Sequence, residues 1–382
     1  MTSATNPIFG ITALGQSIWM DNLSRDLIES GDLKRMISAD GIRGITSNPA
    51  IFEKAIAGNA IYDGDIEAGI RAGKSVLEIY ESLTFADIRQ ACDIFLPLYQ
   101  ESQGSDGFVS IEVPPTIAKD TDSTIGEARR YAAEINRPNV MIKIPGTQEG
   151  LPAVEQVIRE GINVNVTLLF SLQSYIETFW AYIRGLEGRR EDGNDISQVA
   201  SVASFFLSRI DTKIDQQLEN KIAASDDPQH QSVLAQLKGK VAIANAKLAY
   251  QAYKEILQTD RWQSLAQDGA KVQRLLWAST STKDPSYSDV MYVDELVGPD
   301  TVNTLPPDTI AACEDHCAVE SRVESNLEAA HEVIDQLKSP PVEIDLDRVM
   351  AELLEEGIDK FVQPFESLLN SLEQKAQSLV TT

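Results

Sequence analysis

The sequence predicts an α/β protein in which eight parallel strands close into a (β/α)8 barrel, or TIM barrel, with additional helices. Eight short apolar runs rich in β-branched residues recur along the 382 residues, and segments of helical periodicity separate nearly all of them. Strands that alternate with helices form parallel sheets, and eight of them favour closure. An open doubly wound sheet is the alternative, but no G-x-G-x-x-G motif or Walker lysine follows the first run.

The predicted strands are bounded by turn residues. They span residues 17–21, 44–48, 108–113, 140–144, 162–170, 199–206, 274–280 and 301–305. Amphipathic periodicity predicts helices between them. The main candidates span residues 23–39, 74–100, 124–135, 150–160, 172–184 and 239–257.

Segments outside the minimal barrel are also predicted. The polar stretches 187–197 and 224–231 are expected to be loops. Residues 340–382 are rich in leucine and predict two helices, divided around Pro364, that pack on the outside of the barrel. We therefore expect one barrel domain over residues 1–382 with these C-terminal helices packed on it, as a monomer or a homodimer.

Composition narrows the class of protein. Hydrophobic residues make up 43% and charged residues 24% of the chain, as in a soluble protein with a large core. No apolar run is long enough to span a membrane, and a formal net charge of −25 argues against nucleic acid as a partner. The N-terminus lacks the basic and apolar regions of a secretory signal, so we expect a cytoplasmic protein.

Two of the three cysteines, Cys313 and Cys317, are four residues apart with His316 between them. This spacing raises the alternative of a metal site, but a tetrahedral site needs further ligands. The only other histidines are His230 and His331. We therefore expect reduced thiols and no metal.

A polar residue lies near the carboxyl end of almost every predicted strand, which is where barrel active sites lie. One such residue alone is usually a turn former or a helix cap. Several on successive strands predict side chains that converge on one cavity. They are Asp21, Asn48, Glu112, Lys143, Thr167, Ser204 and Ser279.

Lys143 is unusual because it lies in an otherwise apolar strand. Alternation of faces puts it on the same side as Met141 and Pro145, so it can point into the barrel. Burial disfavours the charged form of an amine, and a free amine can attack a carbonyl to form a Schiff base. The alternative is a lysine that extends to the rim or pairs with a carboxylate.

The neighbouring strand ends supply the other groups that this chemistry needs. Asp21 and Glu112 can move protons to and from the carbinolamine and a substrate hydroxyl. Thr167 and Ser204 can hold a water or a hydroxyl, and Asn48 can bind the hydroxyls of a polyol.

A local basic site is expected if the ligand of this acidic protein is an anion. Arg209 follows the sixth strand, and Ser279, Ser281 and Lys283 follow the seventh, where barrels often bind phosphate. The alternative for Arg209 is an ion pair with a surface carboxylate such as Asp211.

Most of the chain resembles the transaldolase family. The motifs that carry the resemblance are SIWMDNLSRD, GITSNPAIF, VSIEVPP, VMIKIPGTQEGLPAV, INVNVTLLFS and the segment that begins LLWASTSTKDP. The resemblance implies a (β/α)8 barrel of the pentose phosphate pathway that needs no cofactor. It also implies transfer of a dihydroxyacetone unit from sedoheptulose 7-phosphate to glyceraldehyde 3-phosphate, giving erythrose 4-phosphate and fructose 6-phosphate.

The resemblance also implies roles for the catalytic residues. Lys143 would form the Schiff base, Asp21 would act as acid and base in carbon–carbon cleavage, and Glu112 with Thr167 would hold the catalytic water. Related barrels that act as simple aldolases have glutamine where Glu112 stands, so the glutamate favours transfer over release.

For substrate binding, the resemblance implies that Asn48 and Ser204 bind the dihydroxyacetone part and Arg209 the phosphate. The chain departs from many family members in one respect. Ser281 stands where they have a second phosphate-binding arginine, and Lys283 is the candidate to supply the missing charge. The length of the chain is similar to that of the larger transaldolases.

The sequence leaves three alternative functions open. They are a phosphosugar aldolase or isomerase, a non-catalytic sugar-phosphate sensor and a metal-dependent aldolase.

Overall fold

The computed structural model describes residues 6–380 and has a closed barrel of eight parallel strands. Each strand pairs with the next along the chain, and β8 pairs with β1. The predicted fold class is therefore confirmed. The strands are β1 (Gln16–Asp21), β2 (Gly44–Thr46), β3 (Phe108–Glu112), β4 (Val140–Pro145), β5 (Val164–Leu169), β6 (Ser201–Phe206), β7 (Arg274–Ala278) and β8 (Thr301–Leu305).

The helices follow the predicted alternation. They are α1 (Pro7–Ala13), α2 (Arg25–Glu29), α3 (Asp32–Arg35), α4 (Pro49–Ile56), α5 (Asp63–Arg71), α6 (Val76–Glu101), α7 (Thr121–Ile135), α8 (Gly150–Arg159), α9 (Leu172–Glu191), α10 (Ser208–Ala224), α11 (Pro228–Leu237), α12 (Val241–Leu257), α13 (Asp260–Gln267), α14 (Met291–Leu296), α15 (Pro307–His316), α16 (Leu327–Lys338) and α17 (Leu346–Val380). Short 3-10 or π turns are η1 (Met36–Asp40), η2 (Ala60–Tyr62) and η3 (Pro115–Ile117).

Two predicted boundaries differ from the structure. The predicted helix over residues 23–39 is broken into α2, α3 and η1, because Gly31 has a φ of +81°, which a continuous right-handed helix does not allow. The predicted loop 187–197 begins later, since α9 continues to Glu191. The break predicted at 224–231 is present between α10 and α11.

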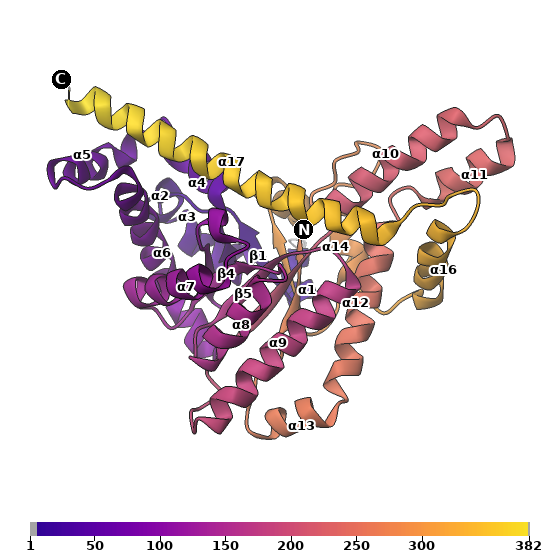
Figure 1. The fold of residues 1–382 in the computed structure, drawn as a ribbon, viewed down its shortest axis with the longest axis horizontal. Helices are drawn as coiled ribbons and strands as arrows, with labels where there is room; N and C mark the ends of the chain where they lie inside the picture. The colour runs from indigo at the N-terminus through magenta and orange to yellow at the C-terminus, as the bar shows by residue number, and fades with distance from the viewer. Residues whose placement is uncertain (1–5, 381–382) are drawn as a thin grey trace, which may run out of the picture.

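The prediction of two C-terminal helices was wrong. The structure has one helix, α17, with Pro364 inside it. A proline in a helix removes one backbone hydrogen bond, but a stripe of buried residues runs along the same face on both sides of it. The stripe consists of Val349, Leu353, Gly357, Phe361, Phe365, Leu368 and Leu372. Helix α17, yellow in Figure 1, crosses the molecule and contacts α4, α5, α6, α10 and β5.

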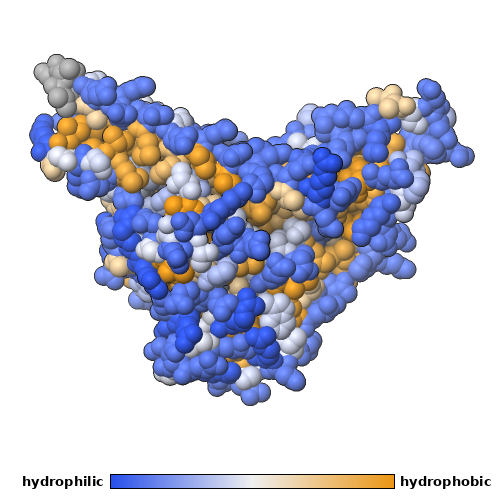
Figure 2. All heavy atoms as spheres, in the orientation of Figure 1, coloured by the Kyte–Doolittle hydropathy of each residue, from blue (hydrophilic) through white to orange (hydrophobic). Residues whose placement is uncertain are grey.

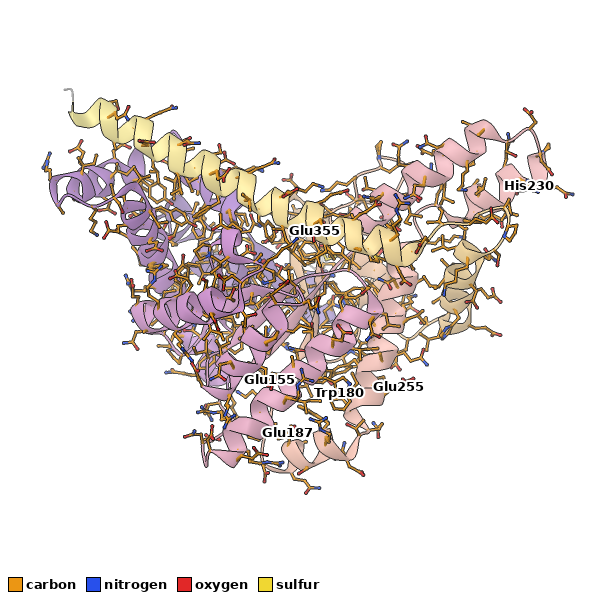
Figure 3. The ribbon with its side chains drawn as sticks, in the orientation of Figure 1. Glu155, Trp180, Glu187, His230, Glu255 and Glu355 are labelled. Carbon is orange, nitrogen blue, oxygen red and sulfur yellow. A yellow bond between two sulfur atoms is a disulfide. The ribbon has the colours of Figure 1, made fainter. Side chains whose placement is uncertain are left out.

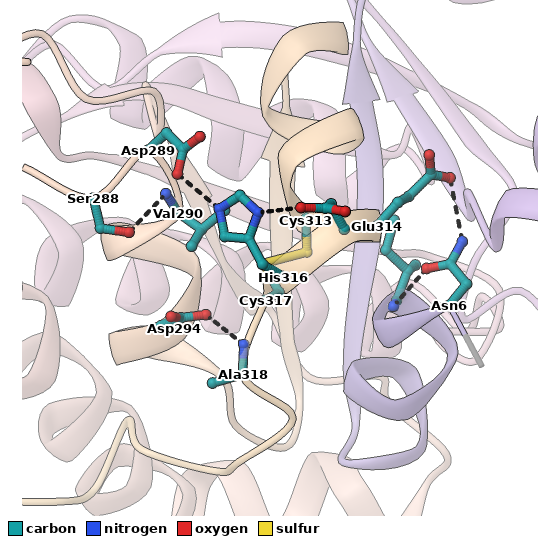
Figure 4. Close-up of a disulfide and its surroundings, with 12 residues drawn as sticks. Asn6, Ser288, Asp289, Val290, Asp294, Cys313, Glu314, His316, Cys317 and Ala318 are labelled. Carbon is teal, nitrogen blue, oxygen red and sulfur yellow. Dashed lines mark hydrogen bonds and ion pairs between the residues drawn. A yellow bond between two sulfur atoms is a disulfide. The ribbon is translucent and has the colours of Figure 1, made fainter. Parts of the chain in front are cut away.

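The expectation of reduced cysteines at positions 313 and 317 was also wrong. The structure joins Cys313 and Cys317 in a disulfide at the end of α15 (Figure 4). Between them, His316 binds Asp289 through Nε2 at 2.9 Å and Asp315 through Nδ1 at 3.1 Å. Sulfur atoms joined in this way are not available as the thiolate ligands that a metal site would need.

Hydrophilic residues cover most of the face shown in Figure 2. Among residues 6–380, no helix combines the length and the apolar character that a membrane crossing requires. The prediction about a secretory signal falls partly on residues 1–5, which lie outside the described part of the chain.

Candidate active site

The polar strand ends meet in one place. A cavity of about 90 Å³ at the carboxyl end of the barrel is lined by six strand-end or near-strand residues that the sequence predicts, together with Arg209. The six are Asp21, Asn48, Lys143, Thr167, Ser204 and Ser279. They come together because the barrel arranges the ends of β1, β2 and β4 to β7 around a single axis.

Lys143 points into this cavity and is almost fully buried, with 5% of its surface exposed. Its Nζ donates a hydrogen bond to the backbone oxygen of Ser47 at 3.0 Å. No carboxylate among the described residues forms an ion pair with it. The centre of the Phe361 ring, from α17, lies 5.7 Å from Nζ. The amine is thus held in a buried position with one neutral hydrogen-bond acceptor.

Asp21 lies across the cavity at the end of β1. Its Oδ1 accepts a hydrogen bond from Thr46 Oγ1 at 2.7 Å. Desolvation raises the pKa of Asp21, although Lys143, the Thr46 hydroxyl and Arg209 each act to lower it. The group can therefore take up a proton more readily than an exposed aspartate can.

Glu112 lies beside Lys143 in the sheet but lines a separate small cavity of about 10 Å³ together with Asn48 and Tyr80. Both of its carboxylate oxygens are buried, and no described residue donates a hydrogen bond to either. Burial raises the pKa of Glu112 to about 7, an effect that Lys143 opposes and Asp21 reinforces. The carboxyl group can therefore exchange a proton near neutral pH.

Thr167 and Ser204 lie on the next two strands. The Thr167 hydroxyl is buried and has no partner among the described residues, so the structure does not bring it into contact with Glu112. Ser204 donates a hydrogen bond to Asn165 Oδ1 at 2.6 Å, and Asn165 Nδ2 donates to Ser110 Oγ at 3.1 Å. This chain of bonds fixes the Ser204 hydroxyl at the cavity wall.

Asn48 is both a helix cap and a site residue. Its side-chain oxygen accepts a hydrogen bond from the backbone nitrogen of Ile51 at 3.1 Å and so caps α4. The cap holds the amide at the junction of the cavities, which leaves its Nδ2 as a donor for a ligand hydroxyl.

Arg209 forms no ion pair with a carboxylate of residues 6–380. Its guanidinium lies over the Phe206 ring at 5.0 Å, and its buried Nη1 has no acceptor among the described residues. The alternative of an ion pair with Asp211 is therefore wrong, since Asp211 instead accepts hydrogen bonds from the backbone of Ala242 and the hydroxyl of Tyr292. An unpaired buried cation of this kind is a ready binding group for an anion.

Two larger cavities share Arg209, Ser279 and Lys283. The first, of about 700 Å³, lies at the barrel mouth and also includes Ser281. The second, of about 710 Å³, lies between α10 and α17 and also includes Lys360. Lys283 Nζ donates to Ser281 Oγ at 2.6 Å, so the two residues near the position of the expected arginine are hydrogen-bonded to each other.

The histidines have separate surroundings. His230, labelled in Figure 3, lies on α11 away from the barrel, and His331 contacts Gln251. Across the described chain, no three His, Cys, Asp or Glu side chains gather in a way that could hold a metal ion.

Residues 18–372 match the family model described as transaldolase/fructose-6-phosphate aldolase. The chain is 68% identical over 375 residues to a transaldolase of Trichodesmium erythraeum, and 65% identical over 377 residues to transaldolase 2 of Nostoc punctiforme. It is 46% identical over 376 residues to a transaldolase of Saccharopolyspora erythraea, and each match covers 98% of this chain and 99% of the relative.

The chain belongs to the transaldolase/fructose-6-phosphate aldolase family. The predicted class of activity, a transferase that works through a lysine Schiff base, is confirmed by this membership and by full-length matches at high identity. Sugar phosphates are the substrates of this family, which agrees with the unpaired cations beside the cavity.

Several residues that line or support the cavity around Lys143 were not predicted from the sequence. Asn165 and Thr46 support Ser204 and Asp21 from inside the strands, and Asn165 could have been found because it is a polar residue on the same face of its strand as Thr167. Phe206 is two residues after the predicted Ser204 and lies on the same face of β6. Phe361 gave no local signal, since it belongs to a helix distant in sequence that reaches the cavity only through tertiary packing.

Proposed function

We propose that Lys143 is the Schiff-base lysine of this transaldolase and that dihydroxyacetone is moved from sedoheptulose 7-phosphate to glyceraldehyde 3-phosphate. The observation that carries this proposal is the single buried amine in a cavity that also contains Asp21. The amine attacks the ketone carbon of the donor, water is lost, and an imine forms.

Asp21 serves as acid and base for the carbon–carbon bond. It accepts the proton of the donor hydroxyl next to the bond that breaks, so that the aldose leaves and an enamine remains on Lys143. It returns the proton when the enamine carbon attacks the acceptor aldehyde. The raised pKa of Asp21 supports this role, because a carboxyl that is easier to protonate is a better base.

Glu112 and Thr167 serve the water that leaves and later returns. The small cavity beside Glu112 has about the volume that one water molecule needs. Its unpaired oxygens can orient that water, and a pKa of about 7 allows proton transfer in either direction. The Thr167 hydroxyl lines the 90 Å³ cavity around Lys143 instead, and it can bind the water on that side. Asn48 and Ser204 bind the hydroxyls of the dihydroxyacetone unit.

The substrate phosphate binds in the cavity between α10 and α17. Four cations line it, Arg209, Lys213, Lys283 and Lys360. Lys213 is paired with Glu352 and Glu356, which leaves three cations for a phosphate. The cavity at the barrel mouth has three cations and three carboxylates among its lining residues, so its charges balance. Ser279 lines both the reactive cavity and the basic one, and Ser281 accepts a hydrogen bond from Lys283, the candidate for the charge of the expected arginine.

A coupled assay tests the function. The purified protein is given sedoheptulose 7-phosphate and glyceraldehyde 3-phosphate, and formation of fructose 6-phosphate is followed. Transfer is expected from the natural chain and none from Lys143→Met. Dihydroxyacetone released at a comparable rate without an acceptor would instead identify a simple aldolase, and absence of both reactions would identify a non-catalytic protein.

A further inference from the structure

Helix α17 completes the reactive cavity from outside the barrel. Phe361 belongs to this helix, lines the cavity and is 5% exposed. Its ring centre is 5.7 Å from Lys143 Nζ and 5.9 Å from Arg209 Cζ. The ring therefore lies close to both the amine that carries the reaction intermediate and the guanidinium that binds anions.

The position of the ring is fixed by contacts along α17. One turn before Phe361, a Cβ placed on Gly357 would lie 2.9 Å from Leu168 Cδ2, so a larger residue does not fit there without movement. On the next turn, Phe365 packs edge-on against Tyr80 with ring centres 5.4 Å apart. At the surface, Glu356 binds Lys213 at 2.5 Å. The Phe361 ring, called the aromatic wall below, is thus held in place by contacts on both sides of it along α17.

A transferase needs such a wall more than a simple aldolase does. After cleavage, the dihydroxyacetone unit stays on Lys143 as an enamine until an acceptor aldehyde arrives. If a water protonates the enamine carbon, the hydroxide that it leaves behind, or a second water that gives its proton to this hydroxide, adds to the imine carbon. The carbinolamine that forms then breaks down to dihydroxyacetone and the free amine, so that one water is consumed overall. No electrons are exchanged in this side reaction, and water is its only co-reactant. A closed apolar wall slows the reaction by excluding water.

We propose that Phe361 is a specificity-determining residue that favours transfer over release by shielding the enamine on Lys143 from water. The inference rests on the proposed role of Lys143. It assigns to the C-terminal helix a part in choosing between two reactions of the same intermediate, in addition to covering the barrel.

The test compares Phe361→Ala and Phe361→Leu with Leu368→Ala. Leu368 is fully buried on the same helix but does not line the cavity, so its truncation loosens the helix without opening the wall. Fructose 6-phosphate is supplied as donor, with and without erythrose 4-phosphate as acceptor. The measured quantity is the ratio of dihydroxyacetone release to transfer.

Opening the wall is expected to raise this ratio by about tenfold in Phe361→Ala, less in Phe361→Leu, and not in Leu368→Ala. The proposal is overturned if this ratio is unchanged in both Phe361 variants. That includes the case in which the rates of release and of transfer fall by the same factor. Phe361→Leu keeps most of the apolar volume, so the ratio can be measured in this variant if the alanine variant does not fold.

Borohydride trapping separates this proposal from the proposed function. If donor and borohydride label Lys143 in the natural chain but the ratio does not move in the variants, Phe361 has no shielding role and the Schiff base stands. If Lys143 is not labelled, the proposed function itself fails.

Discussion

Glu112 and Lys143 are paired neighbours on the adjacent parallel strands β3 and β4, and both are at least nine-tenths buried. On its other side, Lys143 is paired with Asn165 of β5. The register of three strands therefore places a carboxyl group, an amine and an amide in one row at the carboxyl end of the barrel.

Glu112 should contribute to the stability of the folded protein in mild acid and not at alkaline pH. Its folded-state pKa of about 7 lies above its ordinary value of 4.5. Folding therefore favours the protonated form. The resulting stabilisation is fully present below about pH 4.5 and is lost as the pH rises through 7.

Replacing Glu112 by glutamine removes the cost of a buried charge at high pH. We expect Glu112→Gln to unfold at a higher temperature than the natural chain at pH 8, by a margin equivalent to at most roughly 3 kcal/mol. The margin should close near pH 4.5. Thermal unfolding of both proteins at these two pH values measures it, and an equal margin at both would show that the carboxyl is not buried as described. The same variant should lose the inflection near pH 7 in its transfer rate.

Arg209 and Lys360 should bind the phosphate group of the substrate. Loss of a charge-assisted contact costs roughly 1.5–3 kcal/mol, so Arg209→Met or Lys360→Met should raise KM for fructose 6-phosphate about tenfold or more. Lys54→Met is the matched control, because Lys54 lines the charge-balanced cavity at the mouth. A larger effect from Lys54 than from Lys360 would place the phosphate at the mouth instead.

Asn165 should position Ser204 through its hydrogen bond. Asn165→Leu leaves the hydroxyls of Ser204 and Ser110 without their partner, whereas Asn165→Asp can still accept from both. We expect the leucine variant to lose roughly 1–3 kcal/mol of stability and to bind donor more weakly. The aspartate variant should retain more of the donor affinity. Equal donor KM values for the two variants would exclude a positioning role.

The cysteines should show one free thiol. Cys92 is buried and unpaired, while Cys313 and Cys317 form the disulfide. Thiol titration of unfolded protein without reductant should therefore detect one group per chain, and titration after reduction should detect three. Detection of three thiols without reductant would contradict the bond.

The barrel and most of its polar strand ends could be predicted because both follow from local pattern. Strand alternation fixes which face Lys143 occupies, and the topology of a barrel brings Asp21 and Thr167 to the same end. Neither inference requires knowledge of long-range packing. The position of Glu112 in its own small cavity, in contrast, depends on Tyr80 and Phe365, which come from distant helices.

The C-terminal helix could not be predicted in the same way. Pro364 is a strong local signal for a break, but buried residues on both sides of it, such as Phe361 and Phe365, stabilise one continuous helix. Their contribution depends on the surface that the barrel offers. The disulfide of Cys313 and Cys317 was missed because the expected reducing compartment argued against it.

Trapping of the imine tests the central claim most directly. The protein is incubated with fructose 6-phosphate and borohydride, digested, and its peptides are analysed by mass spectrometry. The account predicts a reduced three-carbon adduct on Lys143 and no adduct in Lys143→Met. An adduct on any other lysine, or none while transfer proceeds, would contradict it.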